Sequence, residues 1–229
     1  MARPSALSIS SASGALPPKS SHIISSIRRE RVRMPDPRSP LESLLVSGRF
    51  GAAPAVVIGA RTPVSLWQAS GWGDFDAAAQ PLLSTLGFSA PADYRTAIQA
   101  SGMTLRKTAP DRMLIEGCTD LANYASDALA LLDLSHARSV ITLSGPAART
   151  VLTQLCSVDV RAKCFRPGEF IQTGIHDVGV LIQCAGEDDF EFYVPVTWAV
   201  TVFETIRDNA EPFGYAIKSD DREGAAKEN

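Results

Sequence analysis

Residues 132–168 constrain the fold of this 229-residue chain more than any other stretch, because a strand pattern, a helix pattern and a return loop follow one another there without interruption. In residues 138–143, Ile141 and Leu143 share one face and Thr142 lies on the other, which is the period-two pattern of a half-buried β-strand. A strand of this kind needs a packed layer on its apolar face. The segment therefore predicts a sheet covered by a helix.

The helix pattern begins at Pro146, which suits the first helical position because its missing N–H group would have had no partner there. Ser144 or Gly145 can serve as the N-cap. The apolar residues that follow have the spacing of one helix face: Ala148, Val151, Leu152 and Leu155. This stripe predicts burial against the sheet, but the segment contains no obvious catalytic group.

Elsewhere the sequence predicts more strands than helices. Strand patterns occur at residues 64–69, 103–108, 112–116, 170–173, 178–184 and 190–194, with a further one leading into Asp133. Helices are predicted at 74–86, where Pro81 should kink or divide the helix and Gly87 should end it, and after a cap at Asp120. A last helix is predicted at residues 198–208, burying Ala199, Val202, Phe203 and Ile206. Clustered antiparallel strands with packed helices predict an α+β fold.

Residues 1–33 differ from the rest in charge, since they hold six of the 22 basic residues but one of the 25 acidic residues. From Met34 onward the formal charge is −8, which argues against nucleic acid as a partner, because phosphate binding needs a basic face. We interpret residues 1–38 as a disordered Ser/Arg-rich leader, a transit-like segment, or an extension upstream of a true start at Met34, and favour the last. The domain is expected at 39–215 and a polar tail at 216–229.

Composition indicates a soluble, cytoplasmic globular protein, with 45% hydrophobic and 21% charged residues. The length suits one compact domain or two small lobes, of which we favour one domain. The apolar runs are far shorter than the roughly 18 residues that span a bilayer, so no membrane association is expected.

Motifs for metal, nucleotide or nucleophile chemistry do not occur in the sequence. His136 and His176, the histidines outside the leader, are expected at turns or on the surface. Gly71-Trp72-Gly73 lacks the third glycine of a dinucleotide-binding loop and is interpreted as a turn. No C-x-x-C pair is formed by the four cysteines, which are expected to be free thiols: Cys118, Cys156, Cys164 and Cys184.

Several short motifs follow one another in a fixed order between residues 111 and 215. They are Asp133-Leu134-Ser135, Arg138-Ser139-Val140, Ser144-Gly145-Pro146-Ala147, Val158-Asp159-Val160, Phe165-Arg166-Pro167-Gly168, Val178-Gly179-Val180-Leu181 and Glu211-Pro212-Phe213-Gly214-Tyr215. In this order they resemble the gamma subunit of heterotetrameric sarcosine oxidase. Some of them also resemble, more distantly, the folate-binding domain of aminomethyltransferases and tRNA-modification GTPases, which implies a shared α+β fold.

The second resemblance also implies a difference in chemistry. In aminomethyltransferases a carboxylate follows the stretch that Gly179-Val180-Leu181 matches, and it assists chemistry on the folate-linked methylene group. Here Ile182 follows instead. An apolar side chain cannot relay a proton, so the resemblance implies shape and not activity.

The first resemblance implies a non-catalytic subunit that packs against alpha, beta and delta subunits. Such a complex would oxidise sarcosine to glycine and transfer the methylene group to tetrahydrofolate. FAD, FMN, NAD, tetrahydrofolate and zinc are implied for the complex, and none for this chain. Two alternatives stay open: the equivalent subunit of an N-methylglutamate or other N-methyl amino acid dehydrogenase, and a stand-alone folate-binding aminomethyltransferase-like protein.

Six residues are candidates for turn or interface positions. Asp133, Ser135 and Arg138 could together hold a ligand carboxylate, but we favour Asp133 bonding nearby backbone groups or Arg138 and shaping the turn through Ala137. The others are Arg166 and the closing pair Phe213 and Tyr215. That pair could contact the large subunit or could pin the last helix to the core.

Overall fold

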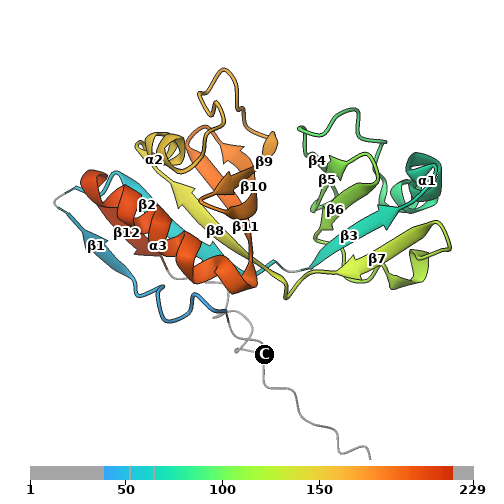
Figure 1. Ribbon diagram of the computed structural model, residues 1–229, viewed down its shortest axis with the longest axis horizontal. Helices are drawn as coiled ribbons and strands as arrows, with labels where there is room; N and C mark the ends of the chain where they lie inside the picture. Colours follow the sequence, from blue (N-terminus) through green and yellow to red (C-terminus); the bar gives the residue numbers. More distant parts are fainter. Residues whose placement is uncertain (1–38, 52, 64, 219–229) are drawn as a thin grey trace, which may run out of the picture. The chain divides into compact units, whose positions relative to one another are not determined.

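The strand-forming runs assemble into two sheets, one of seven strands and one of five (Figure 1). The computed structural model describes residues 39–51, 53–63 and 65–218, and the expectations for 1–38 and 219–229 lie outside them. Both sheets lie in one unit that begins at Pro37. The fold is α+β, as the sequence predicts.

The seven-stranded sheet carries the larger core. Its order is β1 (Gly48–Phe50), β12 (Tyr215–Lys218), β2 (Val56–Arg61), β8 (Arg138–Ser144), β11 (Asp189–Pro195), β10 (Val178–Gly186) and β9 (Phe170–Ile175). Neighbours are antiparallel except β12 and β2, which are parallel. Helices α2 (Ala148–Leu155) and α3 (Ala199–Ala210) cover one face, where their apolar stripes join the sheet in a single cluster (Figure 1).

The five-stranded sheet is antiparallel throughout and has its own core. Its order is β4 (Ile98–Ala100), β5 (Met103–Ala109), β6 (Arg112–Glu116), β3 (Leu66–Gly71) and β7 (Leu129–Asp133). Helix α1 (Phe75–Leu86) packs on it through buried residues such as Phe75 and Leu82. The described residues therefore form two sheets, each with a separate helix-covered core.

The chain crosses between the sheets twice, from β2 to β3 and from β7 to β8. At the second crossing, the Leu134 N–H donates to the Leu66 carbonyl at 2.7 Å, and the Leu66 N–H donates to Ser135 Oγ at 3.0 Å. The two crossing segments are thereby tied to each other at the point where the sheets meet.

Strand β8 is more buried than its sequence pattern predicts. Ile141 and Leu143 face the helix-covered core as expected, but Val140 on the opposite face is also fully buried. Its cluster contains Leu66 from the other sheet and Tyr193 from β11. The half-buried interpretation was wrong because the second sheet covers the outer face of this central strand.

Helix α2 begins later than predicted. Its N-cap is Ala147, without a side-chain hydrogen bond, and Ser144 remains in β8. Gly145 and Pro146 instead make the turn between strand and helix. Gly145 has φ +111°, and an added Cβ would lie 2.6 Å from the Ala55 carbonyl oxygen, so the turn requires glycine.

Three other expectations need correction. Helix α1 continues through Pro81 without division, with Asp74 as its N-cap and Gly87, at φ +76°, as its C-cap. The helix predicted after Asp120 is only a 3₁₀ turn, Ala122–Tyr124, since the Asp120 side chain accepts from the Ala122 N–H but β7 begins at Leu129. Residues 216–218, expected in the polar tail, belong to β12, which pairs with β1 and β2.

Candidate functional site: a polar network between the two sheets

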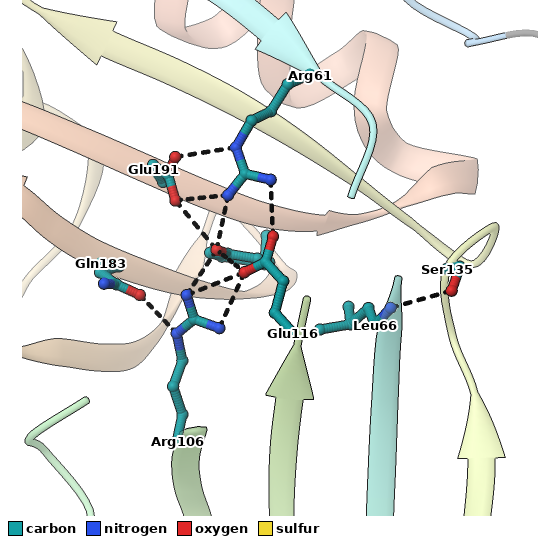
Figure 2. A network of polar contacts seen from close by, with 8 residues as sticks. Arg61, Leu66, Arg106, Glu116, Ser135, Gln183 and Glu191 are labelled. Carbon is teal, nitrogen blue, oxygen red and sulfur yellow. Dashed lines mark hydrogen bonds and ion pairs between the residues drawn. The ribbon is translucent and has the colours of Figure 1, made fainter. Parts of the chain in front are cut away.

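A group of charged and polar side chains lies between the sheets, where apolar packing would be expected. Three strands of the seven-stranded sheet, β2, β10 and β11, and two of the five-stranded sheet, β5 and β6, contribute its members. Five of them are labelled in Figure 2, and the sixth is Tyr193: Arg61, Arg106, Glu116, Gln183, Glu191 and Tyr193. We call this group the inter-sheet network. Glu191 and Tyr193 share a face of β11 because they are two residues apart.

Glu116 is the centre of the inter-sheet network. One carboxylate oxygen accepts from Arg61 at 2.7 Å, and the other accepts from Arg106 at 3.1 and 3.2 Å (Figure 2). The second oxygen also accepts from the Tyr193 hydroxyl at 2.6 Å. The Glu116 side chain is 12% exposed and that of Arg106 is 2% exposed. A carboxylate so enclosed, with two guanidinium partners, joins both sheets through charge-assisted hydrogen bonds.

The two arginines have further partners that fix their positions. Arg61 forms a bidentate ion pair with the Glu191 carboxylate, with hydrogen bonds of 2.8 and 2.9 Å. Arg106 donates to the side-chain oxygen of Gln183 at 2.5 Å and to the Tyr193 hydroxyl at 2.7 Å. The Arg106 guanidinium also lies 4.5 Å from the centre of the Tyr193 ring, a cation–π distance.

The pKa shifts indicate fixed charges in the inter-sheet network. Burial alone would raise the pKa of Glu116, but the charges of Arg106 and Arg61 and its hydrogen bonds lower it below the ordinary value. Burial would lower the pKa of Arg61, and Glu191, Tyr193 and Glu116 together raise it instead. Burial raises the pKa of Tyr193. At neutral pH Arg61 is therefore a cation, Glu116 an anion and Tyr193 a neutral phenol, and none of the three has a proton poised for exchange.

A cavity of about 330 Å³ adjoins the inter-sheet network. Arg61, Arg106, Glu116 and Glu191 line it, so its charges balance, and Gln183 adds an amide. Ile182, the residue at the position of the aminomethyltransferase carboxylate, does not reach this space, because it is fully buried in the core under the helices. Neither the Ile182 side chain nor the Gln183 amide can gain or lose a proton, so neither replaces the aminomethyltransferase carboxylate.

The predicted cluster of Asp133, Ser135 and Arg138 is brought together only in part. One Asp133 oxygen accepts from the Ser135 N–H at 2.8 Å and from its hydroxyl at 2.5 Å, which lowers the pKa of Asp133. Asp133 thus shapes the turn through local groups. Arg138 makes no ion pair or side-chain hydrogen bond with any part of the chain that the structure describes.

The remaining predicted positions lie away from the inter-sheet network. Arg166 is an exposed turn residue whose N–H donates to the Glu169 side chain at 2.7 Å. Tyr215 is buried in the larger core and stacks on Phe50 with ring centres 4.7 Å apart, and Phe213 is partly buried against the same core. In this chain both residues pack on the core, and their contact with another subunit remains a prediction.

The described residues contain no group of three or more His, Cys, Asp and Glu side chains that could hold a metal ion. All four cysteines are free thiols. Gly71-Trp72-Gly73 forms a bend between β3 and α1, which agrees with the predicted turn. Within the described ranges, no helix is both long and apolar enough to cross a membrane.

Sequence reasoning missed every member of the inter-sheet network. A signal was present, since Arg106 and Glu116 lie inside runs that were correctly predicted as strands, where charged residues are unusual when both sheet faces are covered. The pattern could not reveal which strands face each other across the two sheets.

Comparisons with known proteins agree with this fold. The GCVT N-terminal domain matches residues 110–218. Over 60 residues the chain is 38% identical to the sarcosine oxidase subunit gamma of Arthrobacter sp and 40% identical to that of Corynebacterium sp. (strain P-1). Each match covers 26% of this chain and 30% of the relative, so the chain aligns with less than a third of the length of these curated relatives.

A solved structure extends the likeness over most of the fold. A chain of the heterotetrameric sarcosine oxidase from Corynebacterium sp. U-96, solved in complex with pyrrole 2-carboxylate, superposes with a TM-score of 0.66 at 22% sequence identity. The superposition covers 77% of this chain and 95% of that one. The chain is therefore similar to sarcosine oxidase gamma subunits over a short stretch of sequence, and it shares its fold with a chain of such a complex.

Proposed function

We propose that this chain is a non-catalytic, gamma-type subunit of a cytoplasmic sarcosine oxidase complex. In this proposal its partners are the alpha, beta and delta subunits, which hold FAD, FMN, NAD, tetrahydrofolate and zinc. They carry out the oxidative demethylation of sarcosine to glycine and the transfer of the methylene group to tetrahydrofolate. This chain contributes contact surface and no reacting group.

The observation that carries the proposal is the extent of the structural likeness. Nearly the whole of a chain from a heterotetrameric sarcosine oxidase, 95%, superposes on this one, which leaves little of that chain without a counterpart. The Arthrobacter and Corynebacterium relatives, both gamma subunits of sarcosine oxidase, add a stretch of sequence similarity. Because fold alone does not establish function, the subunit role needs its own test.

The chemistry of the inter-sheet network supports a non-catalytic role. Its one deeply enclosed carboxylate, Glu116, has a lowered pKa and two arginine partners, whereas a general acid or base is tuned toward neutral pH. The residues also do not fit folate-dependent methylene chemistry, since Ile182 is buried and Gln183 is an amide. They do not fit zinc within the described residues. No reaction step is therefore assigned to this chain.

Affinity purification of the tagged full-length chain from its native cells tests the proposal. We expect larger flavoprotein subunits to co-purify, and the eluted complex to consume oxygen when sarcosine is added. The same chain produced alone should show no flavin absorbance and no oxygen uptake with sarcosine. N-methylglutamate is tested as the comparison substrate. If the eluted complex prefers it to sarcosine, the subunit belongs to the alternative dehydrogenase. Sarcosine turnover by the isolated chain, or purification as a flavin-free monomer from native cells, would contradict the proposal.

A further inference from the structure

A second cavity lies between the two sheets and differs from the first in charge. Its volume is about 260 Å³, slightly below the range of roughly 300–1,000 Å³ typical of drug-sized ligand pockets. Arg112 of β6 and Arg138 of β8 line it, together with the amide of Gln172. Tyr193, whose hydroxyl belongs to the inter-sheet network, also lines this cavity.

Neither arginine has a counter-ion among the residues that the structure describes. No Asp or Glu is among the residues that line the cavity, and neither Arg112 nor Arg138 forms an ion pair with any described residue. Arg138 is half-buried, and burial lowers its pKa. Withdrawing a guanidinium from water without a partner costs free energy that a bound anion would offset.

The rest of the lining is mixed, since Gln68, Thr108 and Thr173 are polar but one part of the wall is apolar. Leu66 and Leu181, both buried, and the Tyr193 ring form part of the wall. A planar guanidinium matches the two oxygens of a carboxylate, and apolar walls favour a ligand with a hydrocarbon body. We propose that this cavity binds a small organic carboxylate, with the carboxylate on Arg138 and Arg112 and the apolar part against these walls.

The geometry of β10 leaves room for such a ligand. Gly179 lines the cavity, and a Cβ added there would meet no atom within 4 Å. A larger side chain at this position can therefore enter the space that the ligand would occupy. Arg138 also lines a smaller cavity of about 150 Å³ beside His136, which Gly179 does not line, so substitution of Gly179 distinguishes the two.

Titration calorimetry with the full-length chain tests the proposal, using benzoate as the probe and benzamide as its uncharged match. We expect saturable benzoate binding and no saturable benzamide binding. Arg138→Gln should weaken benzoate binding by about tenfold or more, because a charge-assisted contact is lost. Arg112→Gln should weaken it less, since Arg112 is exposed. Gly179→Leu should abolish it. Arg49→Gln, at an exposed arginine outside the cavity, should leave it unchanged.

The proposal is overturned if wild-type protein shows no saturable benzoate binding, if benzamide binds equally well, or if Arg138→Gln has no effect. Unchanged binding in a folded Gly179→Leu variant would also overturn it, by placing the ligand in the smaller cavity. Circular dichroism establishes that each variant is folded, and if Gly179→Leu is not, the two arginine variants decide. No enzyme activity is measured, so the result does not depend on the proposed subunit role.

Discussion

Replacing Glu116 with glutamine should destabilise the folded chain by about 3 kcal/mol, because breaking a buried ion pair from one side leaves the other charge uncompensated. Glutamine keeps the size and one acceptor oxygen of Glu116 but removes the charge that Arg61 and Arg106 share. In this variant Arg61 keeps its ion pair with Glu191. Arg106, whose side chain is 2% exposed, keeps only hydrogen bonds to the neutral side chains of Gln183 and Tyr193. The loss therefore falls mainly on Arg106. It corresponds to about 6–12 °C in melting temperature for a chain of this size.

The pH dependence of this effect has a definite sign. The folded-state pKa of Glu116 lies below its ordinary value of 4.5, so the carboxylate contributes its full stabilisation above pH 4.5. The stabilisation is lost as the pH falls through the lower folded-state pKa, because below that pH Glu116 is protonated in the folded chain as well as in the unfolded chain. The difference in unfolding free energy between wild type and Glu116→Gln should thus be constant between about pH 6 and 8 and shrink in acid.

Urea denaturation followed by circular dichroism, at several pH values, measures this difference. Glu42→Gln, at an exposed glutamate outside the inter-sheet network, is the matched control and should change stability by no more than about 0.5 kcal/mol. The reasoning fails if Glu116→Gln costs no more than the control, or if its cost is the same well below pH 4 as at pH 7. Either result would mean that the two arginines do not need this carboxylate in the folded chain.

Three further predictions concern the fold, and urea denaturation measures each. Leu152→Ala should cost about 2–5 kcal/mol, because Leu152 is fully buried between α2 and the sheet; a cost below 1 kcal/mol would contradict that packing. Gly145→Ala should destabilise more than Gly168→Ala, since both glycines have positive φ but only the former would place a Cβ against the Ala55 carbonyl; equal costs would refute the steric argument. Ser135→Ala should cost about 1–3 kcal/mol, because the Leu66 N–H loses its acceptor at the chain crossing; an unchanged midpoint would show that the crossing does not need it.

Local structure could largely be predicted from the sequence because it depends on spacing along the chain. The burial of Val151 and Leu152 in α2 follows from their helical spacing. The antiparallel pair of β5 and β6 follows from two strand patterns around a turn at Pro110. These features need no knowledge of distant residues. The prediction of a helix after Asp120 was wrong. The apolar spacing there is compatible with a helix, but β7 pairs with β3 and so draws the following residues into a sheet.

The candidate site could not be predicted, because it depends on which strands face one another. Arg61 and Glu116 are 55 residues apart, and Arg61 and Glu191 are 130 apart. Each of these residues by itself resembles a solvated strand residue. The same limit explains Val140, whose polar neighbours in sequence suggest an exposed face although a second sheet covers it. Only the hydrogen bonds between Asp133 and Ser135, which are local, lay within reach of sequence reasoning.

Charge balance separates a structural role from a binding role at this interface. Around the first cavity, Arg61 and Arg106 meet Glu116 and Glu191, so each charge has an internal partner, and a ligand would have to displace an existing ion pair. Around the second cavity, Arg112 and Arg138 face no carboxylate of the described ranges, and a ligand anion would add an ion pair without breaking one. Since desolvation is the main cost of burying charge, the second arrangement gains more from an incoming anion than the first. One interface can therefore hold the two sheets together at one cavity and remain open to a ligand at the other.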